Sequence, residues 1–414
     1  MGGAADGEHR ARYRDVFAVG EFRALFGAQL VSVAGDQLAR VALSILVFDR
    51  THSPAWTALT FAMTFLPDLV GGPLLSGIAD RRPRREVMVA IDLIRMVLMA
   101  ALVPAGLPLW LVGVLVAVVQ LPNTAWNAAR AALLPQILEG DRFAIGQGLF
   151  QMTTQTAQLL GFAVGGLIVA GLGAHGALGV DAGTFLVSAL VVRLGLQRRP
   201  APAQSGETAQ PSWWRQMTVG IATVWGTLSL RALVALACVS GIYIAAEALA
   251  APYAAAIGGG AIAAGLLFAT NPLGMVVGMV IVNRLPYPRR VSLMVPMAVL
   301  SCVPLMGCVW RLDLAATLVL WTISGLASAY NITASVTFVQ SVPDAGRGQA
   351  FGLAQTSIRV SQGLGIILAG VAAESFAAHD VVAAAGLLGA LAATGAGWWW
   401  HRANQPATTV PHRA

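Results

Sequence analysis

Charged side chains are scarce in this chain, and their scarcity excludes most classes of soluble protein. Only 11% of the 414 residues are charged, whereas 57% are hydrophobic, and the mean hydropathy is +0.71. A soluble domain of this length cannot bury that much apolar surface. The composition therefore predicts an all-α polytopic membrane protein, the class that places such surface against lipid.

The patterns that cofactors and catalysis need are also missing. No glycine-rich phosphate loop occurs, which excludes ATP as the energy source, and no histidine lies in the middle of an apolar run. Neither a metal cluster nor a nucleophile constellation is visible, so we expect no cofactor, no metal and no enzymatic activity. The three cysteines lie inside apolar runs, where small core residues are commoner than disulfide partners or metal ligands: Cys238, Cys302 and Cys308.

Lysine is absent, so all the basic charge behind the net charge of +7 is arginine. The arginines lie at the ends of apolar runs and not on one solvated face, which argues against a nucleic-acid partner. They gather in every second loop, with Arg50 and Arg311 as exceptions. Because such loops stay in the cytoplasm, we expect a multi-pass protein of the cell (plasma or inner) membrane, with both termini cytoplasmic and lipids as neighbours.

Apolar runs of about 20 residues, the length that crosses a bilayer core, follow one another along the chain. The twelve predicted spans are 22–48, 55–78, 86–104, 107–129, 146–172, 176–196, 230–255, 261–283, 290–309, 313–338, 349–372 and 379–400. The longest polar stretch, 197–211, lies near the middle, and tryptophans after it favour a helix in the membrane interface. The predicted domains are a cytoplasmic tail (1–21), a six-helix bundle (22–196), a linker with that interfacial helix (197–229), a second six-helix bundle (230–400) and a tail (401–414).

An internal repeat relates the two predicted bundles. A single matching pair is unremarkable in a glycine-rich apolar chain, but several pairs at one offset are not expected by chance. Such repeats are typical of secondary transporters. The pairs, each separated by 204 residues, are Gln151 with Gln355, Gln158 with Gln362, Gly161 with Gly365, and Gly166 with Gly370.

The loop between the second and third predicted spans concentrates charge in nine residues. A basic cytoplasmic loop of no special kind would account for its arginines, but not for the glycine and the aspartate at the helix end. The charged and glycine residues of this loop are Gly77, Asp80, Arg81, Arg84 and Arg85. With them the segment resembles the signature loop between helices 2 and 3 of the major facilitator superfamily, with Pro83 in place of the usual glycine.

That resemblance implies twelve transmembrane helices in two pseudo-symmetric six-helix bundles, the major facilitator fold. Segments 22–36 and 128–135 resemble the branch that holds the enterobactin exporter and the macrolide efflux proteins. The branch implies proton-coupled efflux of a bulky amphipathic metabolite, siderophore or drug by alternating access. Its partners would be that small molecule and protons, and we expect a monomer. Two alternatives stay open: a proton-coupled importer of a small nutrient, and a non-transporting membrane enzyme or scaffold.

Polar side chains recur every three or four residues in four predicted spans, so each set lies on one helix face. In the superfamily these spans (first, fourth, seventh and tenth) line the central cavity, and the resemblance assigns the stripes to substrate binding. Serine and asparagine also serve as hydrogen-bond glue between helices, and that alternative stays open. The candidates are Gln29, Arg40, Gln120, Asn123, Asn127, Tyr243, Ser328 and Asn331, joined by Gln155 and Arg359 on the fifth and eleventh spans.

Carboxylates inside apolar runs are the candidates for proton coupling, because burial favours the protonated form. Glu247 is the strongest candidate, followed by Asp36 and then by Asp68, which follows Pro67. A structural bond to a neighbouring helix is the alternative for Glu247. Asp36 and Arg40 lie one turn apart, so they either form a structural salt bridge or face a cavity as a pair.

Charged residues of the third span extend the arginine-rich loop into the membrane. By the resemblance, Asp80, Arg84, Asp92 and Arg130 form a network that closes the inner side of the transporter. We therefore assign these residues, together with Arg95 and the remaining loop residues, to gating and not to substrate.

Three glycines of the fifth span, Gly161, Gly165 and Gly166, permit a close contact between helices. We expect their partner to be the eighth span. Antiporters of the superfamily carry a proline where this chain has Phe162, so the antiport signature here is weak.

Overall fold

A computed structural model describes residues 13–64, 66–67, 82–200, 213–342 and 347–404, and these residues form helices and no strand. The first helices are α1 (Tyr13–Phe17), α2 (Gly20–Thr51), α3 (Pro54–Ala62), α5 (Arg84–Ala100), α6 (Leu109–Gln120), α7 (Asn123–Ile137) and α8 (Asp141–Gly195). The later ones are α9 (Trp213–Gly226), α10 (Leu228–Cys238), α11 (Ser240–Tyr243), α12 (Ala245–Ala248), α13 (Ala250–Ala256), α14 (Gly260–Asn283), α15 (Tyr287–Leu300), α16 (Val303–Met306), the 3₁₀ helix η1 (Gly307–Trp310), α17 (Leu314–Ser328), α18 (Tyr330–Ser341), α19 (Arg347–Ala372) and α20 (Ala378–Ala403).

The predicted class, an all-α polytopic membrane protein, is confirmed. Eight helical segments of the described part of the chain are long and apolar enough to cross a membrane. One of them, α8, contains the fifth and sixth predicted spans, which meet at Gly173, where φ is 72° and ψ is 170°. The second predicted span, 55–78, runs beyond the described residues, so the count of twelve stays a prediction.

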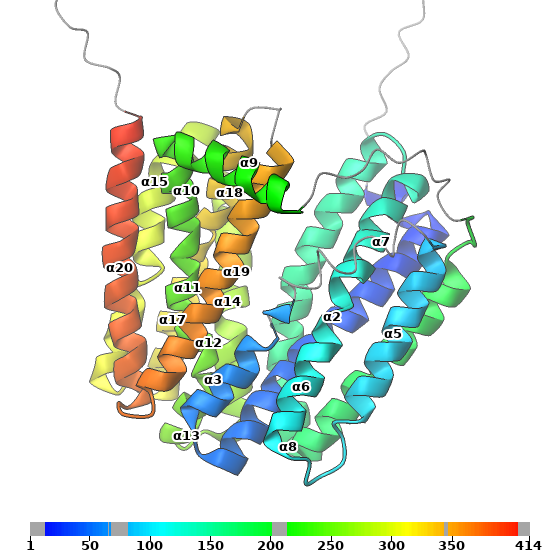
Figure 1. The fold of residues 1–414 in the computed structure, drawn as a ribbon. Helices are drawn as coiled ribbons and strands as arrows, with labels where there is room; N and C mark the ends of the chain where they lie inside the picture. Colours follow the sequence, from blue (N-terminus) through cyan, green and yellow to red (C-terminus); the bar gives the residue numbers. More distant parts are fainter. Residues whose placement is uncertain (1–12, 65, 68–81, 201–212, 343–346, 405–414) are drawn as a thin grey trace, which may run out of the picture. The chain divides into compact units, whose positions relative to one another are not determined.

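The chain forms two compact units. The first comprises residues 1–42 and 67–206, and the second comprises residues 43–66 and 207–414. Within each unit the helices lie side by side along most of their length, and α9 lies across the ends of α10 and α19 (Figure 1). Residues 43–66 thus group with the second half of the chain, and the predicted domain bounds stay a prediction.

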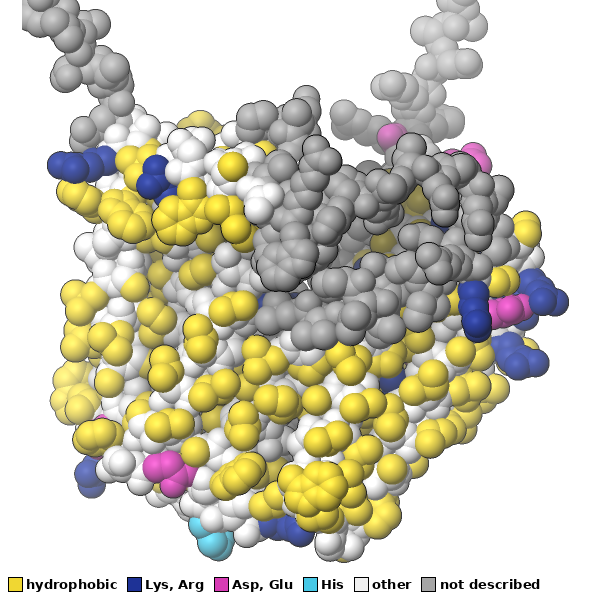
Figure 2. All heavy atoms as spheres, viewed as in Figure 1, with side chains coloured by type: hydrophobic (Ala, Val, Ile, Leu, Met, Phe, Trp, Pro, Cys, Tyr) yellow, Lys and Arg dark blue, Asp and Glu magenta, His cyan; other side chains and the backbone are white. Residues whose placement is uncertain are grey.

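Large apolar side chains cover the outward faces of the helices. Trp110, Leu194 and Leu368 are 68%, 82% and 67% exposed. Figure 2 shows such side chains spread over the middle of the visible face, with arginines gathered near the helix ends. A soluble protein does not expose apolar surface on this scale, so these faces are suited to contact lipid.

Glycine allows α8 to approach α2 closely in the first unit. A Cβ on Gly161 would lie 2.7 Å from the Ala34 carbonyl oxygen and 2.8 Å from the Gln37 Cβ. On Gly165 it would lie 3.3 Å from the Leu38 Cα. The predicted close contact exists, but its partner is α2 and not the predicted eighth span. The reason is that these glycines lie on the face of α8 that packs inside its own unit.

The same kind of contact recurs in the second unit. A Cβ on Gly365, in α19, would overlap the carbonyl oxygen of Gly241, in α11. Gly365 lies 204 residues after Gly161, and each glycine packs against the first predicted span of its half, 22–48 for Gly161 and 230–255 for Gly365. This duplicated contact supports the internal repeat. Gly370, the repeat mate of the buried Gly166, packs against Ala58 of α3.

Gly365→Ala tests whether this backbone contact is structurally required. The added methyl group would meet a carbonyl oxygen that no change of rotamer can move. We expect destabilisation of about 1–3 kcal/mol, as for other overpacked cores, seen as a lower thermal unfolding midpoint in detergent. The control is Gly352→Ala in the same helix, where a Cβ meets nothing within 4 Å. Equal midpoints for the two variants would contradict the contact.

Candidate functional site

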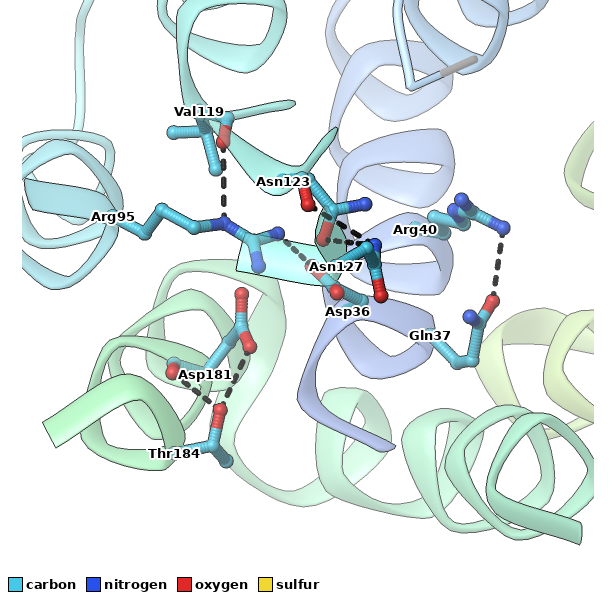
Figure 3. Close-up of polar contacts among 9 residues, drawn as sticks. All are labelled: Asp36, Gln37, Arg40, Arg95, Val119, Asn123, Asn127, Asp181 and Thr184. Carbon is cyan, nitrogen blue, oxygen red and sulfur yellow. Dashed lines mark hydrogen bonds and ion pairs between the residues drawn. The ribbon is translucent and has the colours of Figure 1, made fainter. Parts of the chain in front are cut away.

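Polar residues of the fourth predicted span lie where its helix is interrupted. α6 ends at Gln120 and α7 begins at Asn123, with Pro122 between them. Proline lacks the N–H that a continuous helix needs, so it breaks the hydrogen-bond ladder at this point. The Asn127 side-chain amide donates to the Asn123 backbone oxygen at 3.0 Å and to its Oδ1 at 3.3 Å (Figure 3).

The seventh predicted span is interrupted three times, at Val239, Ile244 and Leu249, which separate α10, α11, α12 and α13. The backbone N–H of Val239 bonds three residues back, to Leu236, at 3.2 Å, as in the tighter 3₁₀ turn. Tyr243 is buried just before the second interruption, and Glu247, one turn later, is half-buried. Both candidates therefore lie on a span whose regular helical hydrogen bonding is interrupted repeatedly.

A third interruption lies in the tenth predicted span, where α17 ends at Ser328 and α18 begins at Tyr330. Asn331 donates to the Tyr243 hydroxyl at 3.1 Å and to the Ser328 backbone oxygen at 3.1 Å. Asn331 lies 204 residues after Asn127. Broken helices with polar side chains at the break are characteristic of transporter binding sites, because irregular backbone in a membrane needs polar surroundings.

The remaining candidates for substrate binding lie on continuous helices. On α2, the Gln29 amide donates to Thr154 of α8 at 3.3 Å, while its oxygen is buried without a hydrogen bond. Arg40 donates to Gln37 at 3.1 Å. Gln155 on α8 and Arg359 on α19 are half-buried.

Asp36 is paired across helices and not along its own helix. Arg95 of α5 donates to Asp36 Oδ1 at 2.7 Å, and its Nε donates to the Val119 carbonyl oxygen at 3.2 Å. The expected pairing of Asp36 with Arg40 is replaced by this ion pair. A buried guanidinium, only 1% exposed, has the greater need of a countercharge. In Figure 3 Arg40 extends away from Asp36 toward Gln37.

Two further aspartates share this apolar interior. Asp92 accepts from Ser188 at 2.7 Å, and Asp181 of α8 accepts from Thr184 at 3.1 Å. Each has one oxygen that is buried without a hydrogen bond. Our sequence reasoning missed Asp181, although the argument used for Glu247, a carboxylate in an apolar span, applies to it equally.

Described arginines of the expected gating network contact backbone carbonyls and an aromatic ring. Arg84 donates to the Ala132 carbonyl oxygen at 3.0 Å, and Arg85 to the Leu196 carbonyl oxygen at 3.0 Å. The Arg130 guanidinium lies 4.7 Å from the centre of the Phe150 ring. The predicted network includes Asp80, which lies outside the described residues, so it stays a prediction. Four candidates lie outside the described residues: Asp68, Gly77, Asp80 and Arg81.

A carboxylate caps the start of α3 inside the second unit. Glu374, which follows α19, accepts from the Ser53 hydroxyl and, at 3.0 Å, from the Ala55 N–H. Anions are favoured at a helix N-terminus. The Ser53 hydroxyl, and secondly the Ala55 N–H, hold the pKa of Glu374 below its usual value. The contact therefore joins α3 to the end of α19 at neutral pH.

Comparison with known proteins places this geometry in context. Residues 25–286 match the Major Facilitator Superfamily. The chain is 29% identical to the uncharacterized MFS-type transporter YkuC of Bacillus subtilis (strain 168), covering 43% of this chain and 42% of that protein. It is 21% identical to Macrolide efflux protein A of Streptococcus pyogenes, covering 51% and 53%. The chain thus spans about half the length, or less, of these curated relatives.

The fold also resembles that of a solved structure, a POT family transporter in complex with 5-aminolevulinic acid. The TM-score is 0.72 and the identity 10%, over 93% of this chain and 96% of that one. At such low identity the likeness concerns the fold alone.

Arg95→Leu tests the buried ion pair. Removing the guanidinium leaves the carboxylate of Asp36 without its countercharge, and we expect a loss of about 3–5 kcal/mol of stability. Arg95→Leu combined with Asp36→Asn removes both charges and should recover part of that loss. Chemical unfolding in detergent measures both, with the exposed Arg289→Leu as control. A single variant as stable as the parent would contradict the assignment.

Proposed function

The chain belongs to the Major Facilitator Superfamily, and we propose that this multi-pass membrane transporter is a proton-coupled exporter of a bulky amphipathic metabolite, siderophore or drug. The observation that carries the proposal is the coincidence of polar side chains with helix interruptions in three spans. A transporter must offer hydrogen bonds to a substrate inside an apolar medium. Interrupted helices offer both side chains and backbone groups for that purpose.

Export, as opposed to import, is supported by similarity. The first half of the chain resembles macrolide efflux proteins at segments 22–36 and 128–135, and a relative is named Macrolide efflux protein A. The candidate residues are amides, hydroxyls and guanidiniums set among apolar walls. Such a mixture suits an amphipathic compound better than a small polar nutrient, which would need most of its surface hydrogen-bonded.

The proposal places the two predicted six-helix bundles in the cell membrane with both termini in the cytoplasm, as the arginine distribution favours. Glu247 and Asp36 are the proposed carriers of the coupling proton among the described candidates, with Asp68 as a third. Glu247 lies one turn after Tyr243, whose hydroxyl accepts from Asn331. Proton exchange at Glu247 would therefore act next to polar groups proposed to bind substrate.

The contact between α3 and α19 is the proposed gate at the outer side. α3 belongs to the first predicted bundle and α19 to the second. Glu374 contacts the N-terminal end of α3, whereas the arginine-rich loop follows the C-terminal end of the same predicted span. Gly370 packs directly on Ala58 beside it. Alternating access requires such a contact to form when the outer side closes and to break when it opens. The arginine-rich loop, with Asp80, is the proposed counterpart at the inner side.

Transport assays in cells and in lipid vesicles test the function. We expect extrusion of ethidium and of a radiolabelled macrolide that collapses when a protonophore removes the proton gradient. Glu247→Gln, which cannot ionise, should reduce this coupled flux sharply while leaving the amount of protein unchanged.

The outcomes separate the alternatives. Accumulation of a nutrient in intact cells, without dye extrusion, would favour the importer. No gradient-dependent flux of either probe would contradict the exporter. Flux with a normal pH dependence in Glu247→Gln would remove Glu247 from the mechanism and leave the exporter standing.

Glu374→Gln tests the outer gate. Because the pKa of Glu374 is lowered, the contact should be complete above the usual pKa of glutamate and be lost as the pH falls through the lowered value. The glutamine variant should weaken the contact at neutral pH and remove this pH dependence. A membrane-impermeant maleimide added outside cells would report opening by labelling Ala58→Cys, a buried position. Glu139→Gln, which neutralises an exposed carboxylate, is the control. Equal labelling of Ala58→Cys when it is combined with Glu374→Gln and with Glu139→Gln would contradict the gate.

A further inference from the structure

Asp181 is a buried carboxyl group to which the proposed transport cycle assigns no role. The residue is 1% exposed, and its Oδ2 atom is buried without a hydrogen bond. Its other oxygen, Oδ1, accepts from the Thr184 hydroxyl at 3.1 Å. In Figure 3 the Asp181 side chain extends toward the guanidinium of Arg95, which itself points to Asp36. An unpartnered oxygen thus faces an ion pair.

The charges around Asp181 do not balance. From α2 the group is faced by Asp36, and from α5 by Arg95. Asp92 of α5 lies close to the same Arg95 and Asp36. Arg130 of α7 lies elsewhere, against Phe150, and Arg40 donates to Gln37. Among the described residues, the Arg95 guanidinium is thus the cation that lies close to all three carboxyl groups, those of Asp36, Asp92 and Asp181. Since uncompensated charge is strongly disfavoured in an apolar interior, protons must supply the missing positive charge.

The surroundings exclude water from Asp181 and make this requirement strict. A Cβ on Gly35 of α2 would overlap both Asp181 Oδ1 and the Thr184 hydroxyl, so the backbone of α2 lies directly on the group. The Phe185 ring lies 4.2 Å from the Arg95 guanidinium carbon. Asp36, whose side chain is 14% exposed, is the most accessible member of the ion pair.

Comparison of the two halves shows that the fold does not need this cluster. The positions 204 residues after Asp36, Asp92, Arg95 and Asp181 are Ser240, Pro296, Val299 and Ala385. The second half forms corresponding helices with no ionisable side chain at any of the four positions. The second half folds without charged residues at these positions. The buried charges of the first half are therefore better explained by function than by stability.

We propose that Asp36, Arg95 and Asp181 form a proton-binding site inside the first unit, at which Asp181 gains and loses a proton during transport. With Asp181 protonated, Arg95 pairs with Asp36 alone, as in the structure. When the proton leaves, the Asp181 carboxylate competes for the same guanidinium, and the hold of Arg95 on Asp36 weakens. Proton exchange thereby changes how tightly α2 is held to α5. The role in transport rests on the proposed function, whereas the proton site does not.

Infrared spectroscopy of the full-length protein in lipid tests the site without any transport. We expect a carbonyl stretching band from a protonated carboxyl group at neutral pH, which disappears on alkaline titration. Thr184→Val removes the hydroxyl that donates to Asp181 and should shift this band, and Asp181→Asn should remove it. The exposed Asp49→Asn should leave it unchanged. No such band, or one unaffected by both variants at Asp181 and Thr184, would overturn the proposal.

Flux in vesicles tests the role in coupling. We expect Asp181→Asn to lose ethidium and macrolide flux driven by a pH gradient while retaining exchange of labelled for unlabelled compound in the absence of a gradient. A neutral asparagine should still permit the conformational change but cannot exchange a proton. Gradient-driven flux like that of the parent would overturn the coupling role.

The two measurements keep this inference separate from the proposed function. If the parent protein shows no gradient-driven flux, the exporter fails, and the infrared band still decides whether Asp181 binds a proton. If the parent transports and the band is absent, the exporter stands and the site fails. Should Asp181→Asn not fold, the band shift in Thr184→Val carries the assignment, because that variant keeps the carboxyl group and nearly the same shape.

Discussion

A single buried guanidinium organises the interior of the first unit. Arg95 donates to Asp36 of α2 and to the Val119 carbonyl oxygen of α6, and it lies over the Phe185 ring of α8. Three other helices, α2, α6 and α8, are thereby tied to α5 through one side chain. In an apolar medium such a charge is tolerated only with close partners on all sides. The packing of these helices therefore depends on the partners that surround Arg95.

The second constraint is the backbone, which must satisfy its hydrogen bonds within the membrane. α2 meets this requirement as one continuous helix of 32 residues. The fourth, seventh and tenth predicted spans are not continuous helices, and a polar side chain lies close to each interruption. The Ser328 hydroxyl donates to the Gly325 carbonyl oxygen at 2.6 Å, just before the break in the tenth span. The polar stripes read from the sequence thus include places where the regular helical hydrogen bonding is interrupted.

The sequence was sufficient to predict the class, the helical segments and the repeat, because these depend on hydropathy and spacing along the chain. The partners of individual side chains could not be predicted in this way. Asp36 and Arg40 have the spacing of a helical ion pair, yet Asp36 pairs with Arg95, 59 residues away. Likewise, Gly161 lacks a side chain, so its close approach to another helix was predictable. The identity of that helix, α2, depends on tertiary packing and was not predictable.

The repeat separates what the scaffold requires from what was added to it. Gly161 and Gly365 make equivalent contacts in the two units, and Asn127 and Asn331, at equivalent positions, each follow a helix interruption. Residues and contacts that recur in both halves are explained by the packing of the helices, or by a role that both halves share, such as contact with substrate. Charged residues present in one half only cannot be explained in that way. Because burial of charge opposes folding, their presence in the first unit requires a benefit that stability does not provide.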